Sequence, residues 1–107
     1  MTSKRDRRKR RPHLVRVLRG PELHVVKAKL RARDGDGCFY CLKAMVEDCT
    51  LEHLHRWADG GTNHPSNLVL AHRDCNWATK DLIVDQKMLL RGDALLAQLK
   101  AGQARAA

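Results

Sequence analysis

Apolar residues at helical spacing mark the first regular element of the chain. Leu23, Val26 and Leu30 recur every three or four residues, which places them on one face of a helix. Pro21 suits the first turn of a helix, and Gly35 follows the last of the periodic residues. The pattern therefore predicts an amphipathic helix that begins near Pro21 and ends before Gly35.

Two short apolar runs with a polar segment between them predict a β-hairpin. The runs are CTLEHL at residues 49–54 and NLVLAH at residues 67–72, and each has the length of a short strand. The segment RWADGGTNHPSN, at residues 56–67, is rich in the residues that favour turns. We expect the two strands to pair across this long loop.

The last third of the chain has a helical pattern with one predicted interruption. From Cys75 to about Arg91 the apolar positions follow a helical stripe. Gly92 and Asp93 then predict the end of this helix and the N-cap of a new one. The sequence ALLAQLKAG would form that final helix, and QARAA is expected to fray.

The net charge is concentrated in the N-terminal segment. The chain carries a formal charge of +9 at pH 7, and residues 1–20 hold nine Lys or Arg against one Asp. A block of like charges with little to bury is typical of a flexible arm, and such an arm can bind the phosphates of a nucleic acid. The alternative is a solvated tail without a partner. The residues expected to contact DNA are Arg5, Arg7, Arg8, Lys9, Arg10 and Arg11.

The remaining composition favours one small intracellular domain. A chain of 107 residues is long enough for one domain, which we place at residues 21–92, between the arm at 1–20 and a C-terminal helix and tail at 93–107. No apolar run approaches the roughly 18 residues that span a membrane, and the charged N-terminus lacks the apolar stretch of a secretory signal. We expect a cytoplasmic location, where paired cysteines bind metal more often than they form disulfides.

The cysteines and one histidine have the spacing of a zinc site. Cys38 and Cys41 form one close pair, and His72 and Cys75 form a second pair after 30 intervening residues. Tetrahedral zinc commonly takes two such pairs, and four protein ligands predict a structural ion rather than a catalytic one. In an alternative set Cys49 replaces one ligand; otherwise Cys49 is expected to be a small buried residue.

The segment RDGDGCFYC, followed by LEHLHRWADGGTNHPSNLVLAHRDCNWATKD, resembles an HNH endonuclease of the ββα-metal, or His-Me finger, family. The family pattern has a Cys pair, an acidic residue and a His on the first strand, a Gly-Gly loop, Asn-Leu at the second strand, and a second Cys pair before Asn and Lys. The resemblance covers residues 31–81. It implies a small α+β fold, in which a structural zinc ties a β-hairpin to a helix, with further helices before and after.

The resemblance also implies a role for each matching residue. His53 matches the general base that takes a proton from the attacking water. Glu52 and Asn76 match the two ligands of a catalytic divalent cation. Asn67 matches the asparagine that holds the loop and orients the histidine, and Lys80 matches a lysine that contacts nucleic acid.

Elementary chemistry supports these roles in the hydrolysis of a phosphodiester. Histidine has an unperturbed pKa of ~6.5, which suits proton abstraction near neutral pH. A carboxylate and an amide oxygen leave a hard cation such as Mg²⁺ or Mn²⁺ with open positions for water and phosphate. Asn76 and Lys80 are four residues apart, so we expect them to share one helix face.

Three positions depart from the family pattern, and the strand raises a geometric problem. Glu52 stands where Asp is more common, Arg56 where Pro is often found, and His72 where Cys is usual. In a regular strand Glu52 and His53 point to opposite faces, so both reach one metal only if the strand twists or bulges. A metal pair of His53 and His55, which share a face, is therefore an open alternative.

The leading functional hypothesis is a metal-dependent endonuclease that nicks or cuts double-stranded DNA. The alternative is a zinc-dependent nucleic-acid-binding module without catalysis, or a packaging accessory protein of a phage. The resemblance favours a small member from a bacterium or a phage, acting in the bacterial or phage-infected cell. Trp57 and Trp77 are expected to pack over the core rather than stack on bases. A single site cuts one strand at a time. No segment of the sequence is recognisable as a dimer interface.

Overall fold

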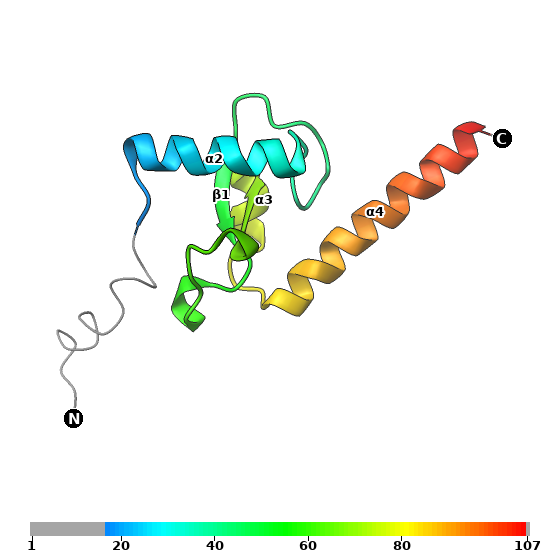
Figure 1. The fold of residues 1–107 in the computed structure, drawn as a ribbon. Helices are drawn as coiled ribbons and strands as arrows, with labels where there is room; N and C mark the ends of the chain where they lie inside the picture. Colours follow the sequence, from blue (N-terminus) through cyan, green and yellow to red (C-terminus); the bar gives the residue numbers. More distant parts are fainter. Residues whose placement is uncertain (1–16, 107) are drawn as a thin grey trace.

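A two-stranded hairpin and three helices form the part of the chain that the computed structural model describes, residues 17–106 (Figure 1). The arm residues expected to contact DNA, Arg5 to Arg11, lie outside the described residues. The elements in chain order are α2 (Gly20–Asp34), β1 (Thr50–His53), η1 (Trp57–Asp59), η2 (Pro65–Asn67), β2 (Leu68–Ala71), α3 (Arg73–Ala78) and α4 (Val84–Ala106). The expected α+β class is confirmed.

Helix α2 forms where the apolar pattern predicted it. Pro21 lies in its first turn, and Gly35 ends it with a φ of 81°, a conformation that glycine adopts without a steric cost. Leu30 is buried in the core and Val26 packs against that core. Lys27 Nζ donates a hydrogen bond of 2.8 Å to the carbonyl oxygen of Cys49, which fixes α2 beside the start of β1.

The predicted hairpin is also confirmed. β1 and β2 pair antiparallel in a regular register, from Thr50 opposite Ala71 to His53 opposite Leu68. All four residues of β2 are buried, so this strand forms the centre of the small core. The buried apolar residues of the core cluster are Leu30, Cys38, Tyr40, Met45, Leu68, Leu70 and Ala71.

The Gly-Gly pair in the hairpin loop is required by the backbone path. Gly60 has a φ of 88°, in the left-handed region, and closes η1. A Cβ atom on Gly61 would overlap the carbonyl oxygen of His55, so the loop can close on itself only with glycine at this position. These two glycines therefore hold the loop close to the end of β1.

The helix predicted from Cys75 to Arg91 is wrong, because the structure has two helices there. Helix α3 ends at Ala78, where the buried Thr79 hydroxyl donates to the carbonyl oxygen of Cys75 at 2.9 Å. Lys80 lies in the following turn, so it does not share a helix face with Asn76 as expected. The chain turns before α4 begins at Val84.

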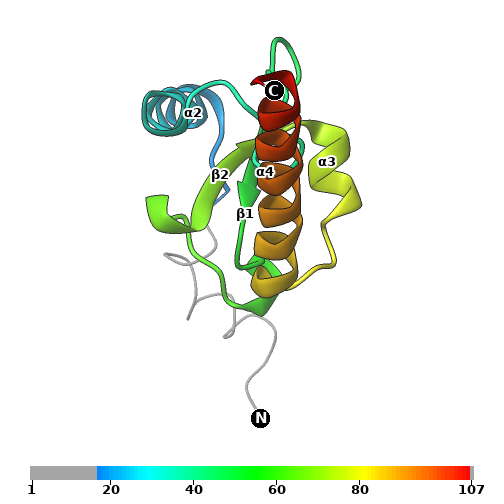
Figure 2. The ribbon, with the colours of Figure 1, turned by 90° about the vertical axis from the view of Figure 1, so that its right-hand side faces the viewer.

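The predicted stop at Gly92 and Asp93 is also wrong, because α4 continues through both residues to Ala106. A glycine inside a helix costs only about 1 kcal/mol, which the neighbouring leucines and alanines tolerate. Arg91 anchors this helix: its guanidinium donates a 2.8 Å hydrogen bond to the carbonyl oxygen of Phe39 and lies over the Phe39 ring. Beyond this anchor α4 leads away from the hairpin (Figure 1), and in the view of Figure 2 it stands in front of the two strands.

The two tryptophans do not pack over the core as expected. The exposed fractions of Trp57 and Trp77 are 43% and 68%. The Lys80 ammonium lies 3.6 Å from the centroid of the Trp77 ring, a cation–π contact on the surface. No helix among the described residues is both long and apolar enough to cross a membrane.

Candidate active site and metal centre

The two ligand pairs predicted for zinc converge on one point. One ligand atom from each of Cys38, Cys41, His72 and Cys75 lies within 4.8 Å of all the others. A zinc tetrahedron with bonds of about 2.0–2.3 Å places its corners about 3.5–3.8 Å apart, so small shifts complete the geometry. Cys41 Sγ is already 3.2 Å from His72 Nδ1. The cluster is compatible with a structural zinc ion.

Groups around the cluster prepare its ligands for a metal. His72 Nε2 lies 3.2 Å from the carbonyl oxygen of Ala44, which can only accept; Nε2 therefore carries the proton and Nδ1 faces the cysteines. Burial raises the pKa of Cys38, but N–H groups of Cys41, His72 and Tyr40 outweigh it and lower this pKa to about 7. A thiolate is the form that binds zinc.

Cys49 is not part of this cluster. Among the described residues, the group that brings metal-binding side chains together consists of the four predicted ligands. Cys49 is partly buried and packs against the hydrophobic core. The cluster joins the Cys38–Cys41 turn to the start of α3, and α3 also carries Asn76.

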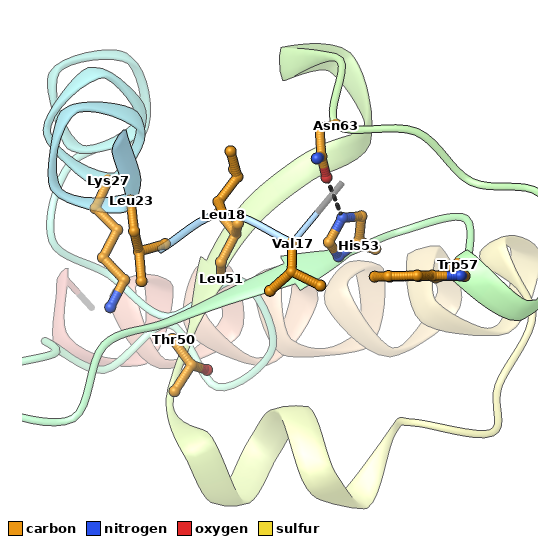
Figure 3. Close-up of a pocket in the computed structure, with 9 residues that line it drawn as sticks. All are labelled: Val17, Leu18, Leu23, Lys27, Thr50, Leu51, His53, Trp57 and Asn63. Atoms are coloured by element: carbon orange, nitrogen blue, oxygen red, sulfur yellow. Dashed lines mark hydrogen bonds between the residues drawn. The ribbon is translucent and has the colours of Figure 1, made fainter. Parts of the chain in front are cut away.

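His53 faces a cavity of about 380 Å³ on one side of β1 (Figure 3). Its Nε2 lies 2.8 Å from Oδ1 of Asn63, a residue of the hairpin loop. An amide oxygen only accepts hydrogen bonds, so Nε2 donates and Nδ1 is left to accept a proton. Val17, Leu18 and Trp57 line the same cavity, which makes the surroundings of His53 mostly apolar.

Asn67 holds the loop that carries these groups. Its Oδ1 accepts a hydrogen bond of 2.7 Å from the backbone N–H of His55. Its Nδ2 donates to the carbonyl oxygens of His55 and Thr62, at 3.1 and 2.8 Å. One side chain therefore fixes both ends of the loop between the strands.

Glu52 lies on the opposite side of β1 from His53 and is buried, with 5% of its surface exposed. The Tyr40 hydroxyl donates to Glu52 Oε2 at 2.8 Å, and the Thr79 hydroxyl oxygen lies 3.3 Å from the same atom. Burial raises the pKa of Tyr40, and the Glu52 carboxylate raises it further, so the phenol stays a protonated donor. Lys87 Nζ lies 3.5 Å from Glu52 Oε1, and only 1% of the Lys87 side chain is exposed.

Lys87 also connects α4 to the backbone of the strand. Its ammonium donates a hydrogen bond of 2.8 Å to the carbonyl oxygen of His53. One buried charge therefore contacts Glu52 and His53, two of the residues that the sequence analysis placed at the catalytic centre. Lys87 was not identified from the sequence; the only signal is that Val84, Lys87, Arg91 and Ala94 fall on one helix face.

Asn76 lies on α3 next to the first strand. Its Nδ2 donates to the carbonyl oxygen of Leu51 at 3.2 Å and to the Thr50 hydroxyl at 3.3 Å. The side-chain nitrogen is thus turned to the strand, and the side-chain oxygen is the atom that suits a cation.

The structure separates some of the residues that the resemblance grouped. β1 is regular, without the bulge that would bring Glu52 and His53 to one face. His55 does not join His53, because its Nε2 lies 2.8 Å from the carbonyl oxygen of Asp59 in the loop. Asn63 is the partner of His53 that the sequence analysis missed, since nothing distinguished it from other polar residues of the turn-rich loop.

A comparison with protein-family models matches the segment that holds these residues. Residues 38–81 match the family model described as HNH endonuclease. The matched segment runs from the first cysteine of the metal cluster through both strands and α3 to the turn that holds Lys80. Neither the curated proteins nor the solved structures gave a match to the chain.

Proposed function

We propose that the chain is an endonuclease that hydrolyses phosphodiester bonds of double-stranded DNA, because residues 38–81 match the family model of HNH endonucleases. The observation that carries the proposal is the fixed histidine of β1. Asn63 orients His53 inside a cavity, and Asn67 fixes the hairpin loop that carries Asn63. These three residues supply a positioned proton acceptor, which this hydrolysis needs.

In the proposed mechanism His53 Nδ1 takes the proton of the attacking water. The hydrogen bond from Nε2 to Asn63 keeps the ring in one tautomer and steadies the imidazolium that forms. The apolar lining from Val17, Leu18 and Trp57 limits the water that competes for the same nitrogen. A positioned general base contributes about 10²–10⁴-fold to such a reaction.

Asn76 and Glu52 are the proposed ligands of a catalytic Mg²⁺ or Mn²⁺. Bound there, the cation would neutralise charge on the phosphate. The amide oxygen of Asn76 has the chemistry for this role. The Glu52 carboxylate is not available to a cation, because it faces the Lys87 ammonium and the hydroxyl groups of Tyr40 and Thr79. Glu52 can bind a cation only if it exchanges these partners, so we assign no step to the cation.

We propose that the Cys₃His cluster binds zinc and that its role is structural. All four of its ligands come from protein, which leaves no position for substrate. The ion would hold Cys75 and, one residue further, the segment of α3 that carries Asn76. Zinc binding can supply about 10–16 kcal/mol of apparent free energy, which is large for a domain with so small a core.

The basic arm is the proposed DNA contact. Residues 1–20 hold nine of the 21 Lys and Arg residues of the chain. Val17 and Leu18, which follow the most basic stretch, line the cavity of His53. An arm that binds phosphates from this point would keep the duplex near the proposed base. Lys80, which lies over the exposed Trp77 ring, offers a second positive charge to the phosphates of DNA.

A second candidate function is a zinc-dependent nucleic-acid-binding module without catalysis. The buried ion pair of Glu52 and Lys87 favours it, because an acidic residue that is neutralised by an internal lysine is not presented to a metal. We propose a bacterial or phage-infected cell as the setting in either case.

Relaxation of a supercoiled plasmid separates the two functions. The protein is incubated with plasmid in Mg²⁺, in Mn²⁺ or in EDTA, and its zinc content is measured afterwards in each sample. An endonuclease converts supercoiled plasmid to nicked or linear DNA with a cation and stops in EDTA while zinc is retained. DNA binding without any cleavage in Mg²⁺ or Mn²⁺ would establish the binding module instead.

A further inference from the structure

Helix α4 exposes an apolar face that points away from the domain. On the side that faces the domain, Lys87 and Arg91 bond to the backbone of His53 and Phe39, and the partly buried Val84 and Ala94 share this face. On the other side the exposed fractions of Leu89, Leu96 and Leu99 are 68%, 55% and 63%. Exposed leucines at helical spacing, on a helix that leaves the domain, are typical of an interface rather than of a solvated surface.

Gly92 lies in the middle of this face and has no structural role within the described chain. Its φ is not positive, and a Cβ added to it would meet nothing within 4 Å. A glycine in a helix interior costs about 1 kcal/mol relative to alanine, so its use here requires a reason. Gly92 forms the floor of a depression between Leu89 and Leu96, and such a depression lets a second helix approach closely.

The face is complementary to itself when two copies run in opposite directions. The midpoint of Leu89 and Leu96 is the peptide bond between Gly92 and Asp93, and Asp85 and Lys100 have the same midpoint. Successive residues of a helix are rotated by about 100°. The side chains of Leu89, Leu96, Asp85 and Lys100 therefore all lie within about 30° of one line along the helix, on the side that faces away from the domain. A two-fold axis that passes beside this peptide bond, perpendicular to the helix, would bring Leu89 into contact with Leu96 of the other copy. It would also bring Asp85 next to Lys100 of the other copy.

We propose that α4 is a dimerisation helix, and that its partner is a second copy of this chain packed antiparallel across Gly92. Asp85 lies near the N-terminal end of α4 and Lys100 lies near its C-terminal end, so the antiparallel arrangement pairs opposite charges and the parallel one opposes like charges. The interface is isologous, as two-fold dimers require, since each residue pair occurs twice. The two domains lie on the outer sides, because each contacts the opposite face of its own helix.

The consequence for activity rests on the endonuclease proposed above. A dimer carries two His53 sites related by a two-fold axis, and the two strands of duplex DNA are related by two-fold axes as well. Each site would then cut one strand, so the dimer makes a double-strand break in one binding event where a monomer makes a nick.

Sedimentation velocity of the full-length protein, without DNA, tests the dimer over a range of 1 to about 300 µM. We expect a shift from monomer to dimer with rising concentration, and for Leu89→Asp a loss of the dimer at every concentration. Val25→Asp places the same charge at an exposed apolar position of α2 and should leave the dimer intact. A monomeric wild type at 300 µM, or a dimer that survives Leu89→Asp, would overturn the proposal.

A charge exchange tests the antiparallel register. Asp85→Lys and Lys100→Asp should each weaken dimerisation by about tenfold, and the double variant should restore it because each pair is re-formed with its charges reversed. A double variant whose dimerisation is weakened by the product of the two single effects would exclude this register.

Cleavage of plasmid by the Leu89→Asp variant distinguishes a failed dimer from a failed nuclease. We expect this variant to nick at the wild-type rate and to lose at least tenfold in linear product. A wild type that dimerises and does not cleave would refute the proposed endonuclease and leave the dimer standing. Linear product undiminished in Leu89→Asp would refute the role of the dimer in cutting both strands.

Discussion

The Cys₃His cluster and strand β1 differ in whether residues close together in the sequence also bring their side chains together in space. The four ligands of the cluster come from two short turns that are 30 residues apart, and their ligand atoms lie within 4.8 Å of one another. Glu52 and His53 are adjacent in the chain, yet one is buried against Lys87 and the other faces a cavity with Asn63. Residues close in sequence thus have side chains that converge in the turns of the cluster, whereas the side chains of Glu52 and His53 diverge in the strand.

The difference follows from backbone geometry. A Cys-x-x-Cys turn directs both side chains to one point, whereas a regular strand sends successive side chains to opposite faces. Each face of β1 is then completed by another part of the chain: the hairpin loop supplies Asn63 to His53, and α4 supplies Lys87 to Glu52. The cluster is self-contained, while the candidate catalytic residues depend on two distant segments.

The largest effect is expected from removing a ligand of the cluster. Cys38→Ser should abolish zinc binding and with it most of the cooperative fold, because the ion would supply about 10–16 kcal/mol. The measurements are zinc content by elemental analysis and thermal unfolding by circular dichroism. Cys49→Ser is the matched control, since Cys49 lies outside the cluster and should keep the zinc. A well-folded wild type without zinc would contradict the structural role of the metal.

The next largest effect is expected from Lys87→Met. Removing one partner of a buried ion pair leaves the other charge uncompensated, which costs about 3–5 kcal/mol. Unfolding in urea measures this loss. The double variant Glu52→Gln with Lys87→Met should recover much of it, because no charge is left buried. Lys29→Met, at an exposed position of α2, is the control and should change stability little.

The same variant tests whether Glu52 can bind a cation. In Lys87→Met the carboxylate has lost its internal cation, so Mg²⁺ or Mn²⁺ should raise the melting temperature more than it does in the wild type. A cation at one hundred times its dissociation constant stabilises the folded state by about 2.7 kcal/mol. Equal responses of the two proteins would contradict the assignment of Glu52 as a cation ligand.

A smaller effect is expected from Asn67→Ala, which removes the hydrogen bonds to His55 and Thr62. Loss of the partner of a partly buried amide costs about 1–3 kcal/mol, and each kcal/mol lowers the melting temperature of a domain this size by about 4–8 °C. Ser66→Ala, in the same loop and exposed, serves as the control. A melting temperature unchanged in Asn67→Ala would mean that this side chain does not hold the loop.

The elements that could be predicted from the sequence are those set by local rules. The periodicity of Leu23, Val26 and Leu30 was sufficient for α2, and the two short apolar runs were sufficient for the hairpin. The spacing of the cysteine and histidine pairs was sufficient for the cluster. In each case the residues that decide the structure lie within a few positions of one another.

The rest depends on contacts between distant segments. The break between α3 and α4 coincides with Thr79, whose hydroxyl donates to the carbonyl oxygen of Cys75 and lies 3.3 Å from the buried Glu52 carboxylate. Gly92 and Asp93 resemble a helix end locally, yet α4 continues through them. The pairing of Lys87 with Glu52 joins residues 35 positions apart, and a buried lysine has no signature in an apolar pattern.

The rate of plasmid cleavage by His53→Ala tests the central claim most directly. His53→Ala removes the proposed base and no ligand of the cluster, so the variant should fold, keep zinc and bind DNA. Its cleavage rate in Mg²⁺ or Mn²⁺ should fall by about 10²–10⁴-fold, whereas His24→Ala, at an exposed position of α2, and His55→Ala should cleave at close to the wild-type rate. Cleavage by His53→Ala at the wild-type rate would contradict the account, and loss of cleavage in His55→Ala alone would move the catalytic role to that residue.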